Sequence, residues 1–149
     1  MVDGKRDGYG IVYSTTHDNN TWLYECEWKQ GSPVNKGRYI WILNNKWRKY
    51  EGPLMNGYLL TGTGSMQNED GHSYQGDYKQ GERQGQGQWN WSNRDSFLGQ
   101  WQNDSRIGQG RYTNADGTYY EGEWMGDKQV GVHKHYNKDG VLTKEQDHK

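Results

Sequence analysis

A short pattern recurs along the chain at a fixed interval: an aromatic residue, any residue, glycine, any residue, and a second aromatic residue. The complete copies are Tyr74-x-Gly76-x-Tyr78, Phe97-x-Gly99-x-Trp101 and Tyr120-x-Gly122-x-Trp124, and each begins 23 residues after the last. Two looser copies precede them and begin at Tyr24 and Tyr50. A fixed period of this length indicates one supersecondary unit repeated along the chain.

Each unit contains two short segments separated by residues that favour turns. A turn residue follows each aromatic copy, at Gly31, Gly57, Gly81, Asp104 and Asp127. The second segment then opens with Gly-x-Gly in three units, at residues 62–64, 85–87 and 108–110. Two alternating segments joined by a turn predict a β-hairpin, so the chain is expected to be all-β.

The glycines are expected to make room for the aromatic rings. Because strand side chains alternate between faces, Tyr74, Gly76 and Tyr78 share one face, and Gln75 and Asp77 lie on the other. Rings of neighbouring units can then pack against bare backbone, and their burial offsets the entropic cost of glycine. The glycines given this structural role are Gly76, Gly85, Gly87, Gly99, Gly108, Gly110 and Gly122.

Composition supports a thin, ring-based structure and excludes some partners. The chain has 22 Gly, 8 Trp and 12 Tyr, and its formal charge is -1. The apolar mass therefore resides in rings, which favours a single layer over a deep core. Without a basic run, nucleic acid is not an expected partner and membrane contact is expected to be weak. The start of the chain lacks the apolar core of a signal peptide, which favours a cytoplasmic location.

The pattern Tyr-x-Gly-x-Trp-x-x-Gly-x-x-x-Gly-x-Gly resembles the MORN (membrane occupation and recognition nexus) repeat. The resemblance implies an elongated single-layer antiparallel meander of β-hairpins with a groove, and no catalytic chemistry in the repeats. It places the repeat array at residues 1–140, with a partial first repeat at 1–13, units starting near 24, 50, 74, 97 and 120, and a polar tail at 141–149. The N-terminal half departs from the pattern: Cys26 and Asn35 stand at glycine positions, and an extra residue lies between Gly57 and Gly62.

Catalytic, metal and cofactor sites are not expected. His133-x-His135 places two imidazoles on one strand face, which is fewer ligands than a zinc site uses. Cys26 lies between two glutamates, which oppose thiolate formation, and its lack of a second cysteine rules out an internal disulfide. The carboxylates that follow ring positions are interpreted as ordinary charges of the solvated face; they are Glu25, Glu27, Glu51, Asp77, Glu121 and Glu123.

Protein binding is the expected function. Tryptophan is enriched at interface hot spots, and the chain has more of it than one-layer packing needs. The segment from residue 4 to residue 12 resembles a second strand without a first, so Tyr9 to Tyr13 are expected to offer an open edge to a partner strand or to a second copy of the chain. The candidate binding residues are Tyr9, Tyr13, Trp89, Trp91, Trp101 and Trp124.

The resemblance implies a non-enzymatic scaffold or adaptor in a cytoskeletal or ciliary assembly, such as an axonemal radial-spoke-type complex. Two alternatives stay open at this point. One is a phospholipid-associated membrane adaptor, and the other is the repeat module of a larger enzyme.

Overall fold

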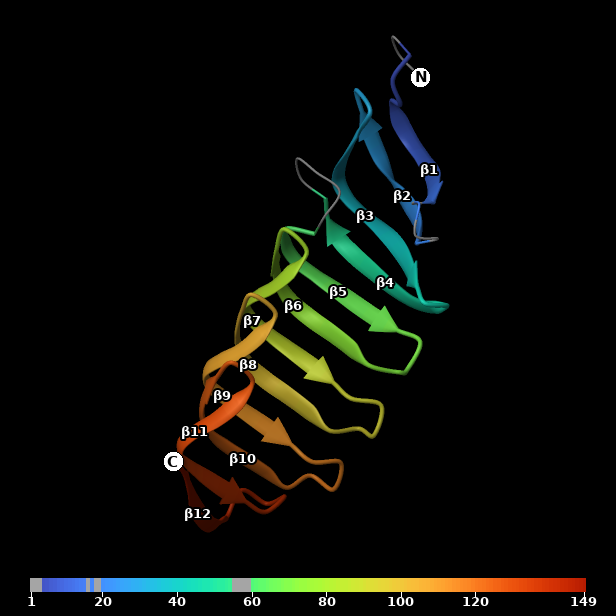
Figure 1. Ribbon diagram of the computed structural model, residues 1–149. Helices are drawn as coiled ribbons and strands as arrows, with labels where there is room; N and C mark the ends of the chain where they lie inside the picture. The colour runs from blue at the N-terminus through green and yellow to red at the C-terminus, as the bar shows by residue number, and fades with distance from the viewer. Residues whose placement is uncertain (1–3, 16, 18–19, 55–59) are drawn as a thin grey trace. The chain divides into compact units, whose positions relative to one another are not determined.

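A computed structural model describes residues 4–15, 17, 20–54 and 60–149, and these form an all-β protein. The strands are β1 (Gly8–Thr15), β2 (Thr21–Lys29), β3 (Ser32–Leu43), β4 (Lys46–Pro53), β5 (Gly62–Asn68), β6 (Ser73–Lys79), β7 (Glu82–Asn90), β8 (Ser96–Gln102), β9 (Ser105–Thr113), β10 (Tyr119–Met125), β11 (Lys128–Tyr136) and β12 (Leu142–His148). They follow one another in a single antiparallel sheet in the order of the sequence (Figure 1). The expected fold class, an antiparallel meander, is confirmed.

The chain divides into two compact units. The N-terminal unit comprises Met1–Gly71 with Tyr78–Gly81, and the C-terminal unit comprises His72–Asp77 with Glu82–Lys149.

Two-residue turns join the strands of five hairpins, and both turn residues have positive φ in each case. The pairs are Gln30 and Gly31, Asn44 and Asn45, Gln80 and Gly81, Asn103 and Asp104, and Gly126 and Asp127. Such turns match the right-handed twist of the flanking strands and favour glycine, asparagine and aspartate. The turns predicted at Gly31, Gly81, Asp104 and Asp127 are therefore confirmed, whereas Gly57 lies outside the described residues.

In the C-terminal unit, glycines of four adjacent strands lie opposite one another. Gly87 pairs with Gly99, Gly99 with Gly110, and Gly110 with Gly122. We call these four residues the glycine row. A Cβ added at Gly110 would lie 2.5 Å from Cε2 of Phe97, a ring that is fully buried. The predicted packing of rings on bare backbone is confirmed here.

The prediction for Gly85 and Gly108 was wrong. Their φ values are +68° and +59°, and an added Cβ would meet the side chains of Asp77 and Gln100 rather than an aromatic ring. The pairing of β8 with β9 shifts register opposite Gly108, as expected for a β-bulge. Gly99 pairs with Gly110 and Gln100 with Ile107, so Gly108 and Gln109 have no partner in β8. The positive φ of Gly108 turns its Cβ direction toward Gln100, so the simple alternation used for the prediction fails at this point. The first glycine of Gly-x-Gly serves the backbone conformation, and the second makes room for the ring.

The two irregular positions of the N-terminal unit fit the same scheme. Cys26 is fully buried and pairs with Gly37, in the place where the other units have glycine. Asn35 has a φ of 60° and lies where the β2–β3 register shifts. Asparagine tolerates this left-handed conformation better than most residues, so the bulge is kept without glycine.

The polar tail expected at 141–149 contains a strand. β12 pairs with β11 along its length, from His148 opposite Gly131 to Leu142 opposite Tyr136. Most of its side chains are exposed, so backbone pairing rather than core packing holds it.

Candidate protein-binding surface

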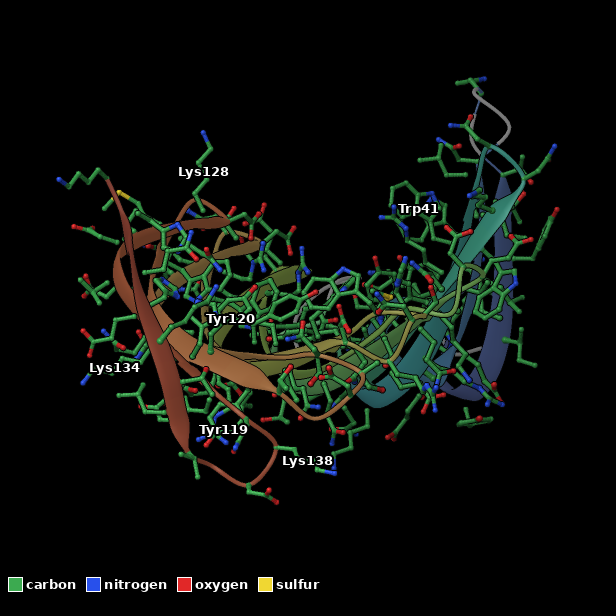
Figure 2. All side chains as sticks on the ribbon, turned by 90° about the horizontal axis from the view of Figure 1, so that it is seen from below. Trp41, Tyr119, Tyr120, Lys128, Lys134 and Lys138 are labelled. Carbon is green, nitrogen blue, oxygen red and sulfur yellow. The ribbon has the colours of Figure 1, made fainter. Side chains whose placement is uncertain are left out.

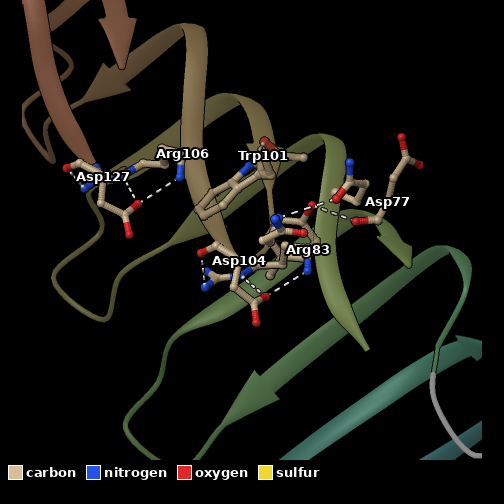
Figure 3. A network of polar contacts seen from close by, with 10 residues as sticks. Asp77, Arg83, Trp101, Asp104, Arg106 and Asp127 are labelled. Atoms are coloured by element: carbon tan, nitrogen blue, oxygen red, sulfur yellow. Dashed lines mark hydrogen bonds and ion pairs between the residues drawn. The ribbon is translucent and has the colours of Figure 1, made fainter. Parts of the chain in front are cut away.

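Two arginines of the C-terminal unit tie neighbouring hairpins together (Figure 3). Arg83 in β7 places Nε 3.1 Å from Asp104 Oδ1 and donates from its terminal nitrogen to the Asp104 carbonyl at 2.8 Å. Arg106 in β9 repeats both contacts with Asp127, each at 3.0 Å. Each aspartate also accepts from the backbone N–H of its arginine. A bidentate contact of this kind fixes the turn of the following hairpin.

The same guanidinium groups cover buried rings. Arg83 lies 4.5 Å from the centre of the Trp101 ring, and Arg106 lies 4.3 Å from that of Trp124. The indole N–H of Trp101 donates to the Gly87 carbonyl at 3.0 Å. The two aspartates were predicted as turn residues, whereas the arginines were not predicted to contact them. Their spacing of 23 residues, equal to that of the aromatic pattern, was the available signal.

Beyond the buried rings, a second set of aromatic side chains is only half-buried. Trp89, Trp91, Tyr112, Tyr120 and His135 contact one another in that order across the C-terminal unit. We call these five residues the ring row. From Trp91 to His135, the ring centres of successive members are 5.0 Å apart, and the rings of Tyr112 and Tyr120 are stacked. Figure 2 shows that Tyr120 and its neighbour Tyr119 lie on opposite sides of the sheet, so the row occupies one face.

Contacts with charged side chains hold the middle of the ring row in place. The Tyr112 hydroxyl donates to Asp95 at 2.7 Å, and burial together with this hydrogen bond raises the pKa of Tyr112. Arg106 lies 5.7 Å from the ring centre of Trp91. The row is therefore a preformed aromatic surface, which lowers the entropic cost of binding a partner.

The six binding candidates from the sequence fall into three environments. Trp89 and Trp91 belong to the ring row. Trp101 and Trp124 are only 3% and 5% exposed, so their rings pack inside the protein rather than form its surface. Tyr9 and Tyr13 are 74% and 67% exposed on β1. The structure thus brings two of the six together in the ring row, and it adds Tyr112, Tyr120 and His135, which were not among the predicted binding residues.

The N-terminal unit has aromatic stacks of its own. Trp22 and Trp41 stack with ring centres 4.9 Å apart, and Tyr39 stacks on Tyr50 at 4.7 Å. Trp41, labelled in Figure 2, borders a hollow of about 160 Å³ that Arg48 and Asp70 also line. These stacks come from the irregular repeats, so ring packing survives where the glycine pattern is incomplete.

One histidine and the cysteine are buried within the sheet. His133 is fully buried against Gly122, and its Nε2 lies 2.8 Å from the Glu123 carbonyl oxygen. Within the described residues, no three His, Cys, Asp or Glu side chains are grouped so that they could hold a metal ion. Burial raises the pKa of the Cys26 thiol, which opposes formation of a nucleophilic thiolate.

The predicted role of the carboxylates as surface charges agrees with their contacts. Glu25 forms an ion pair with Arg38 on the neighbouring strand, and Glu121 forms one with Arg111 at 2.5 Å. Both arginines are half-exposed, so these pairs contribute little to stability.

Comparison with known proteins identifies the repeat. A search of the curated proteins finds no match to this chain, and the described part of the chain contains no helix with the length and apolar character needed to cross a bilayer. The family model of the MORN repeat matches residues 1–18, 24–42, 74–96, 97–119 and 120–132, more than half of the chain. Three of these segments begin where the complete aromatic copies begin, at residues 74, 97 and 120. The chain therefore belongs to the MORN-repeat family.

Proposed function

We propose that the protein is a non-enzymatic scaffold that binds another protein through the ring row. The observation that carries this proposal is a continuous set of five contacting, half-buried aromatic side chains on one face of the C-terminal unit. Aromatic side chains supply large apolar area at low entropic cost, and they dominate interface hot spots. A row that is already assembled needs little rearrangement on binding.

The charge distribution supports a protein partner over a lipid or nucleic acid. The chain carries 18 Lys and Arg against 19 Asp and Glu. Arg83 and Arg106 lie near the row, but they form ion pairs with Asp104 and Asp127. Binding to phosphate-rich surfaces depends on basic groups without such partners.

The cellular setting is part of the same proposal. The resemblance to the MORN-repeat family implies a cytoskeletal or axonemal setting. We therefore infer a cytoplasmic role in a cytoskeletal or ciliary complex, without a cofactor. A phospholipid-associated adaptor and a repeat module of a larger enzyme are the competing functions, and the experiment below separates them by what is recovered with the protein.

The test compares wild type with two single variants. Trp91→Ala truncates a half-buried member of the ring row just beyond the end of β7, where the backbone is not part of a strand. Leu98→Ala is the control, because Leu98 is 54% exposed and lies on the opposite face of β8 from the buried Phe97. Circular dichroism melts establish that both variants are folded.

Affinity purification with mass spectrometry identifies the partner, and titration of that purified partner measures the Kd. Loss of a hot-spot tryptophan costs at least about 2 kcal/mol, so Trp91→Ala is expected to raise the Kd by about 30-fold. Leu98→Ala is expected to leave it unchanged. Equal affinities for all three proteins would refute the role of the ring row. Recovery of lipid, or of a catalytic polypeptide continuous with the repeats, would favour a competing function.

A further inference from the structure

The first strand presents a hydrogen-bonding edge that the described residues leave unpaired. β1 pairs with β2 along one side, from Gly8 opposite Trp28 to Thr15 opposite Thr21. Within residues 4–15, 17, 20–54 and 60–149, no strand pairs with its other side. An open edge of this kind offers a row of N–H and C=O groups to another strand.

The side chains of β1 make this edge apolar. Tyr9, Ile11 and Tyr13 are 74%, 63% and 67% exposed. Their partners in β2 are Glu27, Glu25 and Leu23, so the three side chains share one face. The Tyr9 hydroxyl donates to Glu25 at 2.7 Å on that face, which orients the ring along the sheet. Three large exposed side chains at alternate positions form a continuous apolar stripe at the edge of the sheet.

The last strand of the C-terminal unit shows the opposite design. β12 carries Lys144, Glu145 and Asp147, and its side chains are exposed along nearly its whole length. Charged side chains on an edge strand disfavour pairing with another chain, which is a common protection against association. β1 lacks charges between Gly8 and Thr15. The contrast indicates that the edge of β1 is used rather than protected.

The order of residues in β1 specifies what it pairs with. The segment Tyr9-Gly10-Ile11-Val12-Tyr13 has tyrosine at both ends, small or β-branched residues inside them, and isoleucine at the centre. We propose that β1 pairs antiparallel with β1 of a second copy of this chain, about a two-fold axis at Ile11. Tyr9 then lies opposite Tyr13 of the second copy, Gly10 lies opposite Val12, and Ile11 lies opposite itself.

Both faces of the strand fit this arrangement. On the stripe face, aromatic and β-branched pairs directly opposite one another are among the favoured cross-strand pairs. On the other face, β1 borders a hollow of about 330 Å³ over Trp22, Tyr24 and Trp28. Val12 of one copy would stand opposite Gly10 of the other, so the side chains beside this hollow do not collide.

Charge selects the antiparallel orientation. Lys5, Arg6 and Asp7 precede β1. Parallel pairing in register would place each of these charges beside the same charge of the second copy, which is unfavourable. In the antiparallel arrangement Asp7 instead lies opposite Thr15, at the uncharged end of the other strand. An isologous contact of this kind closes on itself and yields a dimer rather than a filament.

This dimer goes beyond the proposed function and is independent of it, because the ring row belongs to the C-terminal unit and β1 to the N-terminal unit. The test measures the mass of the 149-residue chain by sedimentation equilibrium across a range of concentrations. Wild type is expected to show a monomer–dimer equilibrium. Ile11→Lys places two like charges at the two-fold axis and removes an apolar contact, so the dimer Kd is expected to rise by at least about tenfold.

Two further samples make the result specific to this geometry. Ile42→Lys is the matched control. Ile42 is also exposed, but it lies in β3 opposite Trp47 of β4, away from the edge of the sheet. The dimer Kd of this variant is expected to match that of wild type. An equimolar mixture of Ile11→Lys and Ile11→Glu is expected to recover dimers, since opposite charges then meet at the axis. A monomeric wild type, a dimer unaffected by Ile11→Lys, or no recovery in the mixture would each overturn the proposal.

Discussion

Replacing Gly110 by alanine tests the claim that the second glycine of Gly-x-Gly makes room for a ring. The new methyl carbon would lie 2.5 Å from Cε2 of Phe97. Phe97 is fully buried, with the ring centre of Trp101 at 5.5 Å and that of Trp124 at 5.2 Å, so its ring has little space to move. The φ of Gly110 is not positive, so the substitution adds a steric clash without backbone strain.

The expected cost lies between two limits. Overpacking a core by one methyl group costs about 1–3 kcal/mol, and complete loss of a buried phenylalanine contact costs about 3–5 kcal/mol. Because the neighbouring rings keep Phe97 in place, we expect a loss of about 2–4 kcal/mol. For a chain of this size, that loss lowers the Tm by about 5–15 °C.

Thermal melts followed by circular dichroism measure the effect, with Gln109→Ala as the matched control. Gln109 is exposed and adjacent in β9, so its truncation is expected to change stability by less than about 0.5 kcal/mol. Combining Gly110→Ala with Phe97→Leu shortens the opposing side chain and is expected to recover about 1 kcal/mol relative to the sum of the single changes. Equal melts for Gly110→Ala and Gln109→Ala would refute the assignment of faces.

Three further predictions concern charge. Arg106→Lys keeps the charge but loses the bidentate contact with Asp127, so the free energy of unfolding in urea is expected to fall by about 1–2 kcal/mol. Arg111→Lys, which changes a half-exposed ion pair, is the control and is expected to lower it by less than about 0.5 kcal/mol. Burial, and next the charge of Lys144, lower the pKa of His135, so the folded state disfavours the imidazolium. Stability is therefore expected to fall as the pH drops below about 6.5, the pKa of an unperturbed histidine. In melts at successive pH values, His135→Gln is expected to flatten this dependence. Liposomes containing acidic phospholipid are expected to co-sediment only marginal protein at physiological salt, and strong binding abolished by reversing a set of basic residues would contradict the choice of a protein partner.

The hairpins could be predicted from the sequence because their signals are local. Each turn needs two residues with positive φ, and glycine, asparagine and aspartate mark those places in the chain. The aromatic-glycine alternation then specifies which face each ring occupies. Both signals recur every 23 residues in the C-terminal unit, so each repeat supports the interpretation of the next repeat.

The remaining features depend on contacts between units or on small changes of register. The positive φ of Gly108 directs an added Cβ toward the side chain of Gln100 instead of an aromatic ring, and alternation alone cannot reveal this. Trp101 and Trp124 were candidates for the surface because tryptophan favours interfaces, yet Arg83 and Arg106 cover them. The arginine contacts join residues 21 positions apart, a separation that no single hairpin pattern contains.

Position along the strands separates stability from recognition in the C-terminal unit. Where the glycine row crosses the sheet, Phe97 lies directly on the backbone of Gly110 and becomes inaccessible to a partner. Two residues farther along β9, the cross-strand neighbours are Tyr112 and Tyr120; they stack on each other instead of on glycine, which leaves them half-exposed. A substitution in the glycine row therefore collides with a core ring, whereas a substitution in the ring row changes what the surface presents. The same repeat can accordingly keep its fold while its exposed rings vary, which is the property that a binding scaffold requires.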